Sequence, residues 1–437
     1  MEWDKNLFKK FVDKYGTPLY AYNTEIISTQ IYALRSFLPS CFNIFYSMKA
    51  NPSLGIVSYI GDKVEGIEVA SEGELFIALR AGISPERIIF VGPGKTYYEL
   101  LYAIKNSILA IVVESLQEAN IINEISKQLN KITKVIIRIN PKKELSGARI
   151  KMGGMSKQFG IDEEELVNII PSMLQLKNVG IEGIHVYMGT QILEPSLHIQ
   201  SFDNILATAH NLQVNYGIKL KVIDFGGGFG VPYFNGEHKL DLVEIRNGLQ
   251  TIFQTYEEKM DFSEIKLIVE SGRFIVAESG CFLTRILYRK KSRDKIFLIT
   301  DGGSNNHSTA AGIGRFARQN FPIDIINQLS SDYIEKVDIV GPLCTPTDVL
   351  VQNVEIPVTQ EGDVIIILKS GAYGFSASSL NFLSHPWPTE IMFDKNNEYL
   401  IRQRQTKEEL ISGQLLPFSK NKEEKTIWNN SSQKLKI

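Results

Sequence analysis

Strand-like and helix-length segments alternate regularly between residues 43 and 270. The strand-like segments are short and rich in aliphatic and aromatic residues, and they are Asn43–Met48, Gly66–Ala70, Arg87–Val91, Ala110–Glu114, Lys134–Asn140, Gly180–Met188, Leu220–Phe225 and Lys266–Glu270. The helical segments include Gly73–Ala81, Thr96–Asn106, Leu116–Leu129, Glu163–Leu174, His198–Tyr216 and Leu242–Met260. This rhythm predicts a parallel sheet closed into a (β/α)8 barrel of the TIM type. An open doubly wound sheet is the alternative, because a sequence does not show closure.

The alternation stops after Gly272, and the later strand-like segments have no regular helices between them. They are Ser279–Lys291, Lys295–Thr300, Ile334–Val340, Val349–Pro357, Asp363–Leu368 and Glu390–Phe393, with a helical interruption predicted near Pro322–Ser330. The chain is therefore predicted to be an α/β barrel followed by an all-β domain. The predicted division is an N-terminal segment at 1–23 that packs with the β domain, a barrel at 24–280, a β-sandwich or β-barrel at 281–405 and a polar tail at 406–437.

Composition narrows the class of protein. The chain has 437 residues, of which 43% are apolar and 22% charged, as is typical of a globular protein with two domains. A formal charge of −2 gives no reason to expect nucleic acid as a partner. The first residues lack a signal-peptide core and no apolar run could span a bilayer, so we expect a cytoplasmic protein without a membrane partner. The cysteines and histidines show no metal-binding spacing, so no metal site is predicted.

Lys49 directly follows the first predicted barrel strand. In barrels of this type the chemistry lies at the C-terminal ends of the strands. A lysine at a strand end more often points into water at the start of a loop. An ammonium in an apolar setting, by contrast, is costly unless it is paired or used chemically. Other strand ends decide between these interpretations.

The seventh and eighth predicted strands end in groups that suit a phosphorylated, planar cofactor. Gly226, Gly227 and Gly228 follow the seventh strand, where successive glycines let backbone amides approach an anion. The eighth strand ends at Glu270, followed by Ser271, Gly272 and Arg273. A carboxylate here can pair with a protonated pyridine nitrogen, and an arginine can add positive charge near a phosphate. Without a functional role, the glycine run would be a tight turn, and Glu270 and Arg273 would be surface residues of a loop. Together with Lys49, these groups favour pyridoxal phosphate bound as a Schiff base.

Two further stretches carry candidate residues. His185 and Tyr187 share one face of the sixth strand, so either could cover a planar ring. In the β domain, the loop 341–348 holds Cys344 between prolines, which favours an exposed and reactive thiol. Tyr373 follows a glycine turn and could reach a phosphate.

These motifs, in this order, resemble the fold-type III pyridoxal phosphate decarboxylases, the family of diaminopimelate, ornithine and arginine-type decarboxylases, from about Thr17 to Phe393. The resemblance implies an alanine racemase-like barrel, Lys49 as the Schiff-base lysine and a homodimer with shared active sites. It also implies that Cys344, donated by the partner subunit, returns a proton to the α-carbon. Alanine racemases place an arginine against the ring nitrogen, so Glu270 favours decarboxylation. The implied cofactor-binding residues are Lys49, Glu68, His185, Tyr187, Gly226, Gly227, Gly228, Glu270, Ser271, Gly272, Arg273 and Tyr373.

The chain departs from this family in informative places. The ring-stacking histidine of the family falls at Tyr187, and its usual aspartate on the second strand falls at Glu68. Diaminopimelate and ornithine enzymes carry a carboxylate just after the cysteine, which receives the distal ammonium of the substrate, whereas this chain has Thr345. The stretch 147–161 and the residues from Asp301 to Arg315 resemble a branch that acts in biosynthetic clusters, where a carrier protein can present an aminoacyl substrate. The candidate substrate-binding residues are Arg315, Thr345, Asp348 and Tyr373.

The sequence therefore favours decarboxylation of an amino acid that lacks a free distal ammonium, such as a carrier-bound glutamyl group. A diaminopimelate decarboxylase of lysine biosynthesis is one alternative, and Thr345 speaks against it. A catalytically silent binding protein is another, opposed by the presence of both Lys49 and Cys344. The third is a cofactor-free barrel that uses Lys49 for aldolase-type chemistry, which would leave the glycine run and Glu270 without a purpose.

Overall fold

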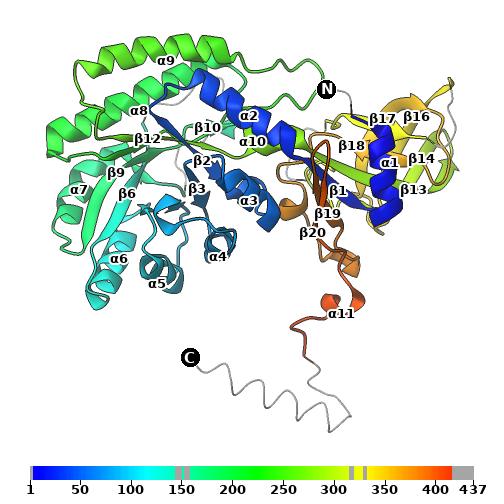
Figure 1. Ribbon diagram of the computed structural model, residues 1–437, viewed down its shortest axis with the longest axis horizontal. Helices are drawn as coiled ribbons and strands as arrows, with labels where there is room; N and C mark the ends of the chain where they lie inside the picture. The colour runs from blue at the N-terminus through cyan, green and yellow to red at the C-terminus, as the bar shows by residue number, and fades with distance from the viewer. Residues whose placement is uncertain (1–2, 143–149, 152–157, 314–318, 328–331, 416–437) are drawn as a thin grey trace, which may run out of the picture.

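The computed structural model describes residues 3–142, 150–151, 158–313, 319–327 and 332–415, with the backbone alone for 150–151. A barrel and a β-rich region lie side by side along the long axis of the molecule (Figure 1). Among the described residues, no helix combines the length and the apolar character needed to cross a membrane.

Eight parallel strands close the barrel, so the open-sheet alternative is wrong. They are β2 (Phe42–Ser47), β3 (Gly66–Val69), β4 (Ile88–Phe90), β5 (Ala110–Val113), β6 (Thr133–Asn140), β9 (Val179–Val186), β11 (Val222–Asp224) and β12 (Lys266–Ser271). Closure comes from β12, which pairs with β11 on one side and with β2 on the other. Their aliphatic side chains fill both the barrel interior and the layer beneath the helices.

The helices surround this barrel, and short polar residues start several of them. The helices are α2 (Thr24–Phe37), α3 (Leu54–Gly61), α4 (Glu72–Arg80), α5 (Tyr97–Asn106), α6 (Leu116–Gln128), α7 (Leu166–Leu174), α8 (Pro195–Tyr216) and α9 (Leu242–Glu257). Ser71, Thr96 and Ser115 each cap a helix by accepting a hydrogen bond from a backbone N–H of its first turn. These caps lie where a strand turns into a helix, which fixes the rim at which the strands end.

The N-terminal segment is built into the β-rich region. Strand β1 (Leu19–Asn23) pairs antiparallel with β13 (Gly280–Ser292) and parallel with β19 (Thr389–Phe393). The other strands of this region are β14 (Lys295–Thr300), β15 (Ile323–Ile326), β16 (Ile334–Val340), β17 (Val349–Pro357), β18 (Val364–Ile367) and β20 (Glu398–Arg402). Helix α1 (Lys5–Tyr15) buries Phe8 and Phe11 against this sheet. The exact domain boundaries stay a prediction.

The predicted helical interruption is wrong over residues 323–326. This stretch forms β15, which pairs antiparallel with β18. The alternating Ile323 and Ile325 belong to a half-buried strand, and the pattern is too short to be told from a helix without its partner. Residues 328–330, which complete the prediction, lie outside the described residues.

We expect His198 to make the fold sensitive to acid. The ring lies within α8, only 2% exposed, stacked on Phe229 at 4.7 Å and facing the Ile192 carbonyl oxygen at 3.2 Å. Burial lowers the pKa of His198 to about 4. The unfolded chain therefore takes up a proton near pH 6.5 while the folded chain resists until about pH 4, so stability falls as pH falls through this window, by roughly 3 kcal/mol.

The check is denaturant unfolding at pH 7.5 and at pH 4.5 for the wild type, for His198→Gln and for His238→Gln. His238 is exposed and serves as the matched control. The His198→Gln variant should lose less stability on acidification than the wild type, and His238→Gln should lose as much. Equal losses in all three proteins would contradict a buried neutral His198.

Candidate active site

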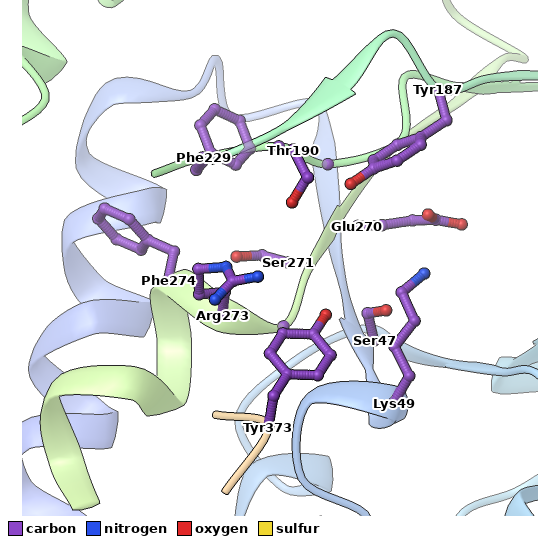
Figure 2. Close-up of a pocket in the computed structure, with 13 residues that line it drawn as sticks. Ser47, Lys49, Tyr187, Thr190, Phe229, Glu270, Ser271, Arg273, Phe274 and Tyr373 are labelled. Carbon is purple, nitrogen blue, oxygen red and sulfur yellow. The ribbon is translucent and has the colours of Figure 1, made fainter. Parts of the chain in front are cut away.

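A pocket opens at the C-terminal ends of the barrel strands, where β2, β11 and β12 meet residues of the β-rich region (Figure 2). Its described lining is Ser47, Lys49, Tyr187, Thr190, Gly227, Gly228, Phe229, Glu270, Ser271, Gly272, Arg273, Phe274 and Tyr373. These residues come from five parts of the chain, and most of them are candidates from the sequence. The barrel therefore gathers the predicted groups at one place.

Lys49 lies on a short 3-10 turn, Met48–Ala50, directly after β2. Its side chain reaches into the pocket, 43% exposed, and its Nζ donates to Glu68 Oε1 at 3.0 Å. The ring of Tyr187 lies 5.7 Å from the same Nζ. Burial alone would lower the pKa of Lys49, but the charges of Glu68 and Glu270 outweigh it and raise the pKa. The amine is thus paired with a carboxylate from β3 and stabilised in its charged form by a second carboxylate from β12.

The glycine run forms a cradle at the end of β11. Gly226 donates its N–H to Asp224 Oδ1 at 2.9 Å and has a φ of 60°, which favours glycine. A Cβ on Gly227 would lie 2.2 Å from the carbonyl oxygen of Glu270, so any larger residue would push the backbone apart. The chain can approach a ligand here only through its backbone, as a phosphate site requires.

Arg273 and Ser271 complete a polar wall beside this cradle. The Ser271 hydroxyl and Arg273 Nε are buried and have no hydrogen-bond partner among the described residues. The guanidinium of Arg273 lies 4.6 Å from the centre of the Tyr373 ring, which enters from the β-rich region. Tyr373 is fixed by its backbone N–H, which donates to the Ala50 carbonyl oxygen at 2.8 Å. Buried donors that lack a protein acceptor suit an anionic group such as a phosphate.

Glu270 is 4% exposed, and its Oε1 is buried without a partner among the described residues. Its Oε2 lies 3.6 Å from His185 Nε2. Burial would raise the pKa of Glu270, but His185, Lys49 and Arg138 together lower it to about 2. The pocket therefore holds a carboxylate that stays ionised at neutral pH and can pair with a protonated ring nitrogen.

The structure separates the two candidates for the face of the ring. Tyr187 lines the pocket near Lys49, with its side chain directed into it (Figure 2). His185 is 2% exposed and lies behind Glu270, outside the pocket lining. This geometry favours Tyr187 over His185 as the residue that covers the ring, and the assignment of His185 to the cofactor stays a prediction.

The loop 341–348 does not contribute to this pocket among the residues that the structure describes. Cys344 is exposed and Thr345 is half-buried. Asp348 is 3% exposed, and its carboxylate accepts hydrogen bonds from the backbone N–H groups of Ser304 at 2.6 Å and Leu343 at 2.8 Å. Asp348 therefore shapes the loop, and its assignment to substrate binding stays a prediction that these contacts do not favour. Arg315 and most of the stretch 147–161 lie outside the described residues.

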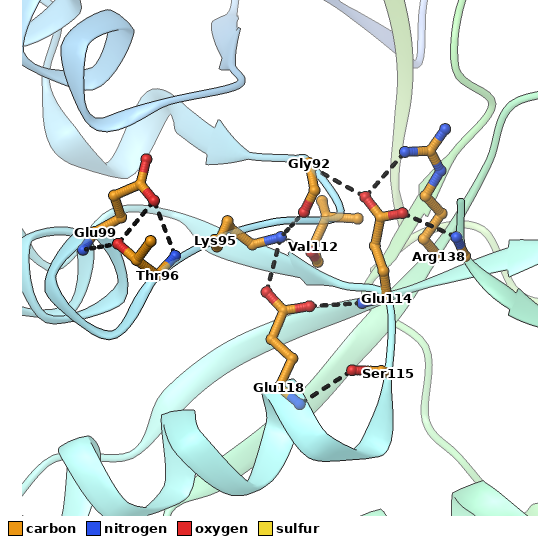
Figure 3. A network of polar contacts seen from close by, with 10 residues as sticks. Gly92, Lys95, Thr96, Glu99, Val112, Glu114, Ser115, Glu118 and Arg138 are labelled. Atoms are coloured by element: carbon orange, nitrogen blue, oxygen red, sulfur yellow. Dashed lines mark hydrogen bonds and ion pairs between the residues drawn. The ribbon is translucent and has the colours of Figure 1, made fainter. Parts of the chain in front are cut away.

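Sequence reasoning missed a buried charge network on the rim of the barrel (Figure 3). Glu114 accepts hydrogen bonds from Arg138 Nη1 at 3.0 Å and from the backbone N–H groups of Gly92 and Gly160. Lys95, with a 2% exposed side chain, contacts Glu118 at 2.8 Å. The network ties together the ends of β4, β5 and β6. The signal was available, since Glu114 and Arg138 are charges inside segments that otherwise predict buried strands.

A closed (β/α)8 barrel with a lysine after its first strand, a glycine cradle after its seventh and a carboxylate at its eighth defines a class of pyridoxal phosphate enzyme. Residues 24–277 match the family model described as "Pyridoxal-dependent decarboxylase, pyridoxal binding domain". The chain belongs to this family, the fold-type III decarboxylases.

Individual relatives span almost the whole chain. It is 38% identical to the L-glutamyl-[BtrI acyl-carrier protein] decarboxylase of Niallia circulans, over 95% of this chain and 97% of the relative. It is 32% identical to a diaminopimelate decarboxylase of Aquifex aeolicus, over 93% and 94% of the two chains. The solved diaminopimelate decarboxylase of M. jannaschii with L-lysine superposes with a TM-score of 0.86 at 28% identity, over 93% of this chain and 94% of that one. The chain is thus a pyridoxal phosphate-dependent decarboxylase.

Proposed function

We propose that this enzyme removes the α-carboxylate of an amino acid whose side chain carries no free ammonium, with a glutamyl group on a carrier protein as the favoured substrate. The observation that carries this proposal is the loop 341–348. Thr345 is neutral, and its hydroxyl lies 3.1 Å from that of Thr347. The one carboxylate of the loop, that of Asp348, is buried and bound by backbone amides. The loop therefore offers a distal ammonium no partner.

The named substrates of two relatives support this substrate class. The relative from Niallia circulans is named for a glutamyl group on an acyl-carrier protein. A relative from Staphylococcus aureus, 33% identical over 87% of this chain and 94% of its own, is a 2-[(L-alanin-3-ylcarbamoyl)methyl]-2-hydroxybutanedioate decarboxylase. In the second name the side-chain nitrogen is part of an amide and carries no ammonium.

Different pocket residues are assigned to different parts of the cofactor. We assign Lys49 to the amine that binds the cofactor aldehyde, and Gly226–Gly228, Ser271 and Arg273 to its phosphate. Tyr187 covers the ring, and Glu68 pairs with Lys49. When bound, pyridoxal phosphate accepts the electron pair that remains on the α-carbon after carbon dioxide leaves. Glu270, held ionised, keeps a proton on the ring nitrogen and so favours this acceptance.

A second subunit completes the site in this proposal. Proton return to the α-carbon needs a donor close to Lys49, and the exposed Cys344 is absent from the described lining of the pocket in its own chain. A homodimer in which each Cys344 reaches the partner's pocket supplies that donor. The same arrangement places Thr345 against the substrate side chain.

The test is carbon dioxide release by the cofactor-loaded enzyme from three compounds: a glutamyl thioester of a carrier protein, free L-glutamate and meso-diaminopimelate. We expect turnover of the thioester and little or none of meso-diaminopimelate. In Thr345→Glu, kcat/KM for meso-diaminopimelate should rise by at least about tenfold, because a hydrogen bond to a charged group contributes about 1.5–3 kcal/mol. Thr345→Gln is the matched neutral control and should give no such rise. Rapid turnover of meso-diaminopimelate by the wild type would favour the lysine-pathway alternative.

A further inference from the structure

Three ionisable side chains meet behind the pocket at the ends of neighbouring strands. They are His185 of β9, Asp224 of β11 and Glu270 of β12, and they are 2%, 0% and 4% exposed. One ligand-type atom of each lies within 4.8 Å of the other two. Asp224 and His185 are direct partners in the β11–β9 register. The barrel itself therefore sets their separation.

Several buried polar atoms of this cluster have no hydrogen-bond partner among the described residues. Asp224 Oδ1 accepts from the Gly226 N–H, but Asp224 Oδ2 has no partner among the described residues, and neither has either ring nitrogen of His185. Glu270 Oε1 is likewise free, on a side chain that lines the pocket. Buried polar atoms without partners are costly. A proton shared among these three groups would satisfy several of them at once.

The position of that proton follows from electrostatics. Two carboxyl groups this close in a buried site oppose each other's ionisation. Burial, reinforced by the charge of Glu270, raises the pKa of Asp224 well above its ordinary range. The neighbouring His185, Lys49 and Arg138 lower the pKa of Glu270 to about 2, against the effect of burial. The proton therefore resides on Asp224, which becomes a hydrogen-bond donor, while Glu270 keeps its charge.

We propose that Asp224 and His185 are positioning residues that bracket Glu270 and keep its carboxylate directed at the pocket. Asp224 has a second task in the same geometry, because its Oδ1 also orders the glycine cradle through Gly226. One side chain thus links the phosphate-binding turn to the carboxylate that serves the ring nitrogen. The inference rests on the assignment of Glu270 to the cofactor ring and does not depend on the identity of the substrate.

The test compares Asp224→Asn with Asp224→Ala. An asparagine amide can donate to Glu270 while its carbonyl oxygen accepts from Gly226, so Asp224→Asn should keep the Kd for pyridoxal phosphate within about threefold. Asp224→Ala loses both interactions and should raise the Kd by on the order of tenfold or more. It should also change the pH dependence of the visible absorbance of the bound cofactor. Neither readout requires a substrate, so a wrong substrate proposal leaves the test intact.

A double-mutant cycle with Glu270→Gln shows whether Asp224 acts through Glu270. In the Glu270→Gln background, Asp224→Ala should change the absorbance profile little further. The inference is overturned if Asp224→Asn is as harmful as Asp224→Ala, or if Asp224→Ala has its full effect on the profile without Glu270. A stoichiometric metal ion in the purified protein would also overturn it, since these three ligands could then be a metal site. If the alanine variant does not fold, Asp224→Ser, which keeps an acceptor for Gly226, takes its place.

Discussion

Replacement of Lys49 by alanine is expected to lower kcat by at least about a thousandfold, because the enzyme loses both the group that holds the cofactor and a proton carrier at the reacting carbon. Lys49 Nζ lies in the pocket and donates a hydrogen bond to Glu68 at 3.0 Å. The charge of Glu270 also favours its protonated form. Borohydride reduction of the wild type should fix the cofactor to the peptide that contains Lys49, as seen by mass spectrometry. The alanine variant should show no such adduct.

Lys49→Arg is the matched control for the charge. An arginine keeps a positive charge beside Glu68, but its guanidinium does not form a Schiff base with the aldehyde of the cofactor. We therefore expect Lys49→Arg to retain more of the thermal stability of the cofactor-free protein than Lys49→Ala, and to be as inactive. Near-normal activity in either variant would remove Lys49 from the centre of the mechanism.

The barrel and most of its site could be predicted because their signals are local in the sequence. A strand, a turn and a helix each occupy a continuous stretch. Lys49 and Gly226–Gly228 closely follow strands, and Glu270 lies near the end of one. The order of the strands then brings these ends to one rim, whatever the details of packing.

The remaining features depend on orientation or on pairs of distant residues. Asp348 follows Cys344 closely in the sequence, but its carboxylate points into the loop and is bound by backbone amides. The pairing of Glu114 with Arg138 joins two strands that are separated by a helix. No spacing rule brings His185, Asp224 and Glu270 together, because each lies on a different strand. Such contacts follow from the register of the closed barrel, which a sequence does not show.

Cys344→Ala is expected to lower kcat by about a hundredfold, the usual scale for removal of a general acid, and to leave cofactor binding intact. The difference from Lys49→Ala is physical: loss of carbon dioxide still proceeds, and water must return the proton in place of the thiol. We expect a normal Kd for pyridoxal phosphate and a product whose α-carbon takes up deuterium from heavy water with lower stereoselectivity. Cys41, exposed and distant in sequence, provides the matched control as Cys41→Ala, which should behave as the wild type.

The position of Cys344 in the assembly can be tested by mixing two proteins that each have at most about one hundredth of the wild-type activity. If each pocket combines Lys49 of one chain with Cys344 of the other, a heterodimer of Lys49→Ala and Cys344→Ala has one site with both residues intact and one with neither. Random exchange at equal concentrations makes half of the dimers mixed, so activity should return to about one quarter of the wild-type value. If both residues of a site came from one chain, mixing would restore nothing. Recovery therefore identifies a shared site, and its absence, after exchange has been confirmed with labelled subunits, would mean that Lys49 and Cys344 of one site come from the same chain.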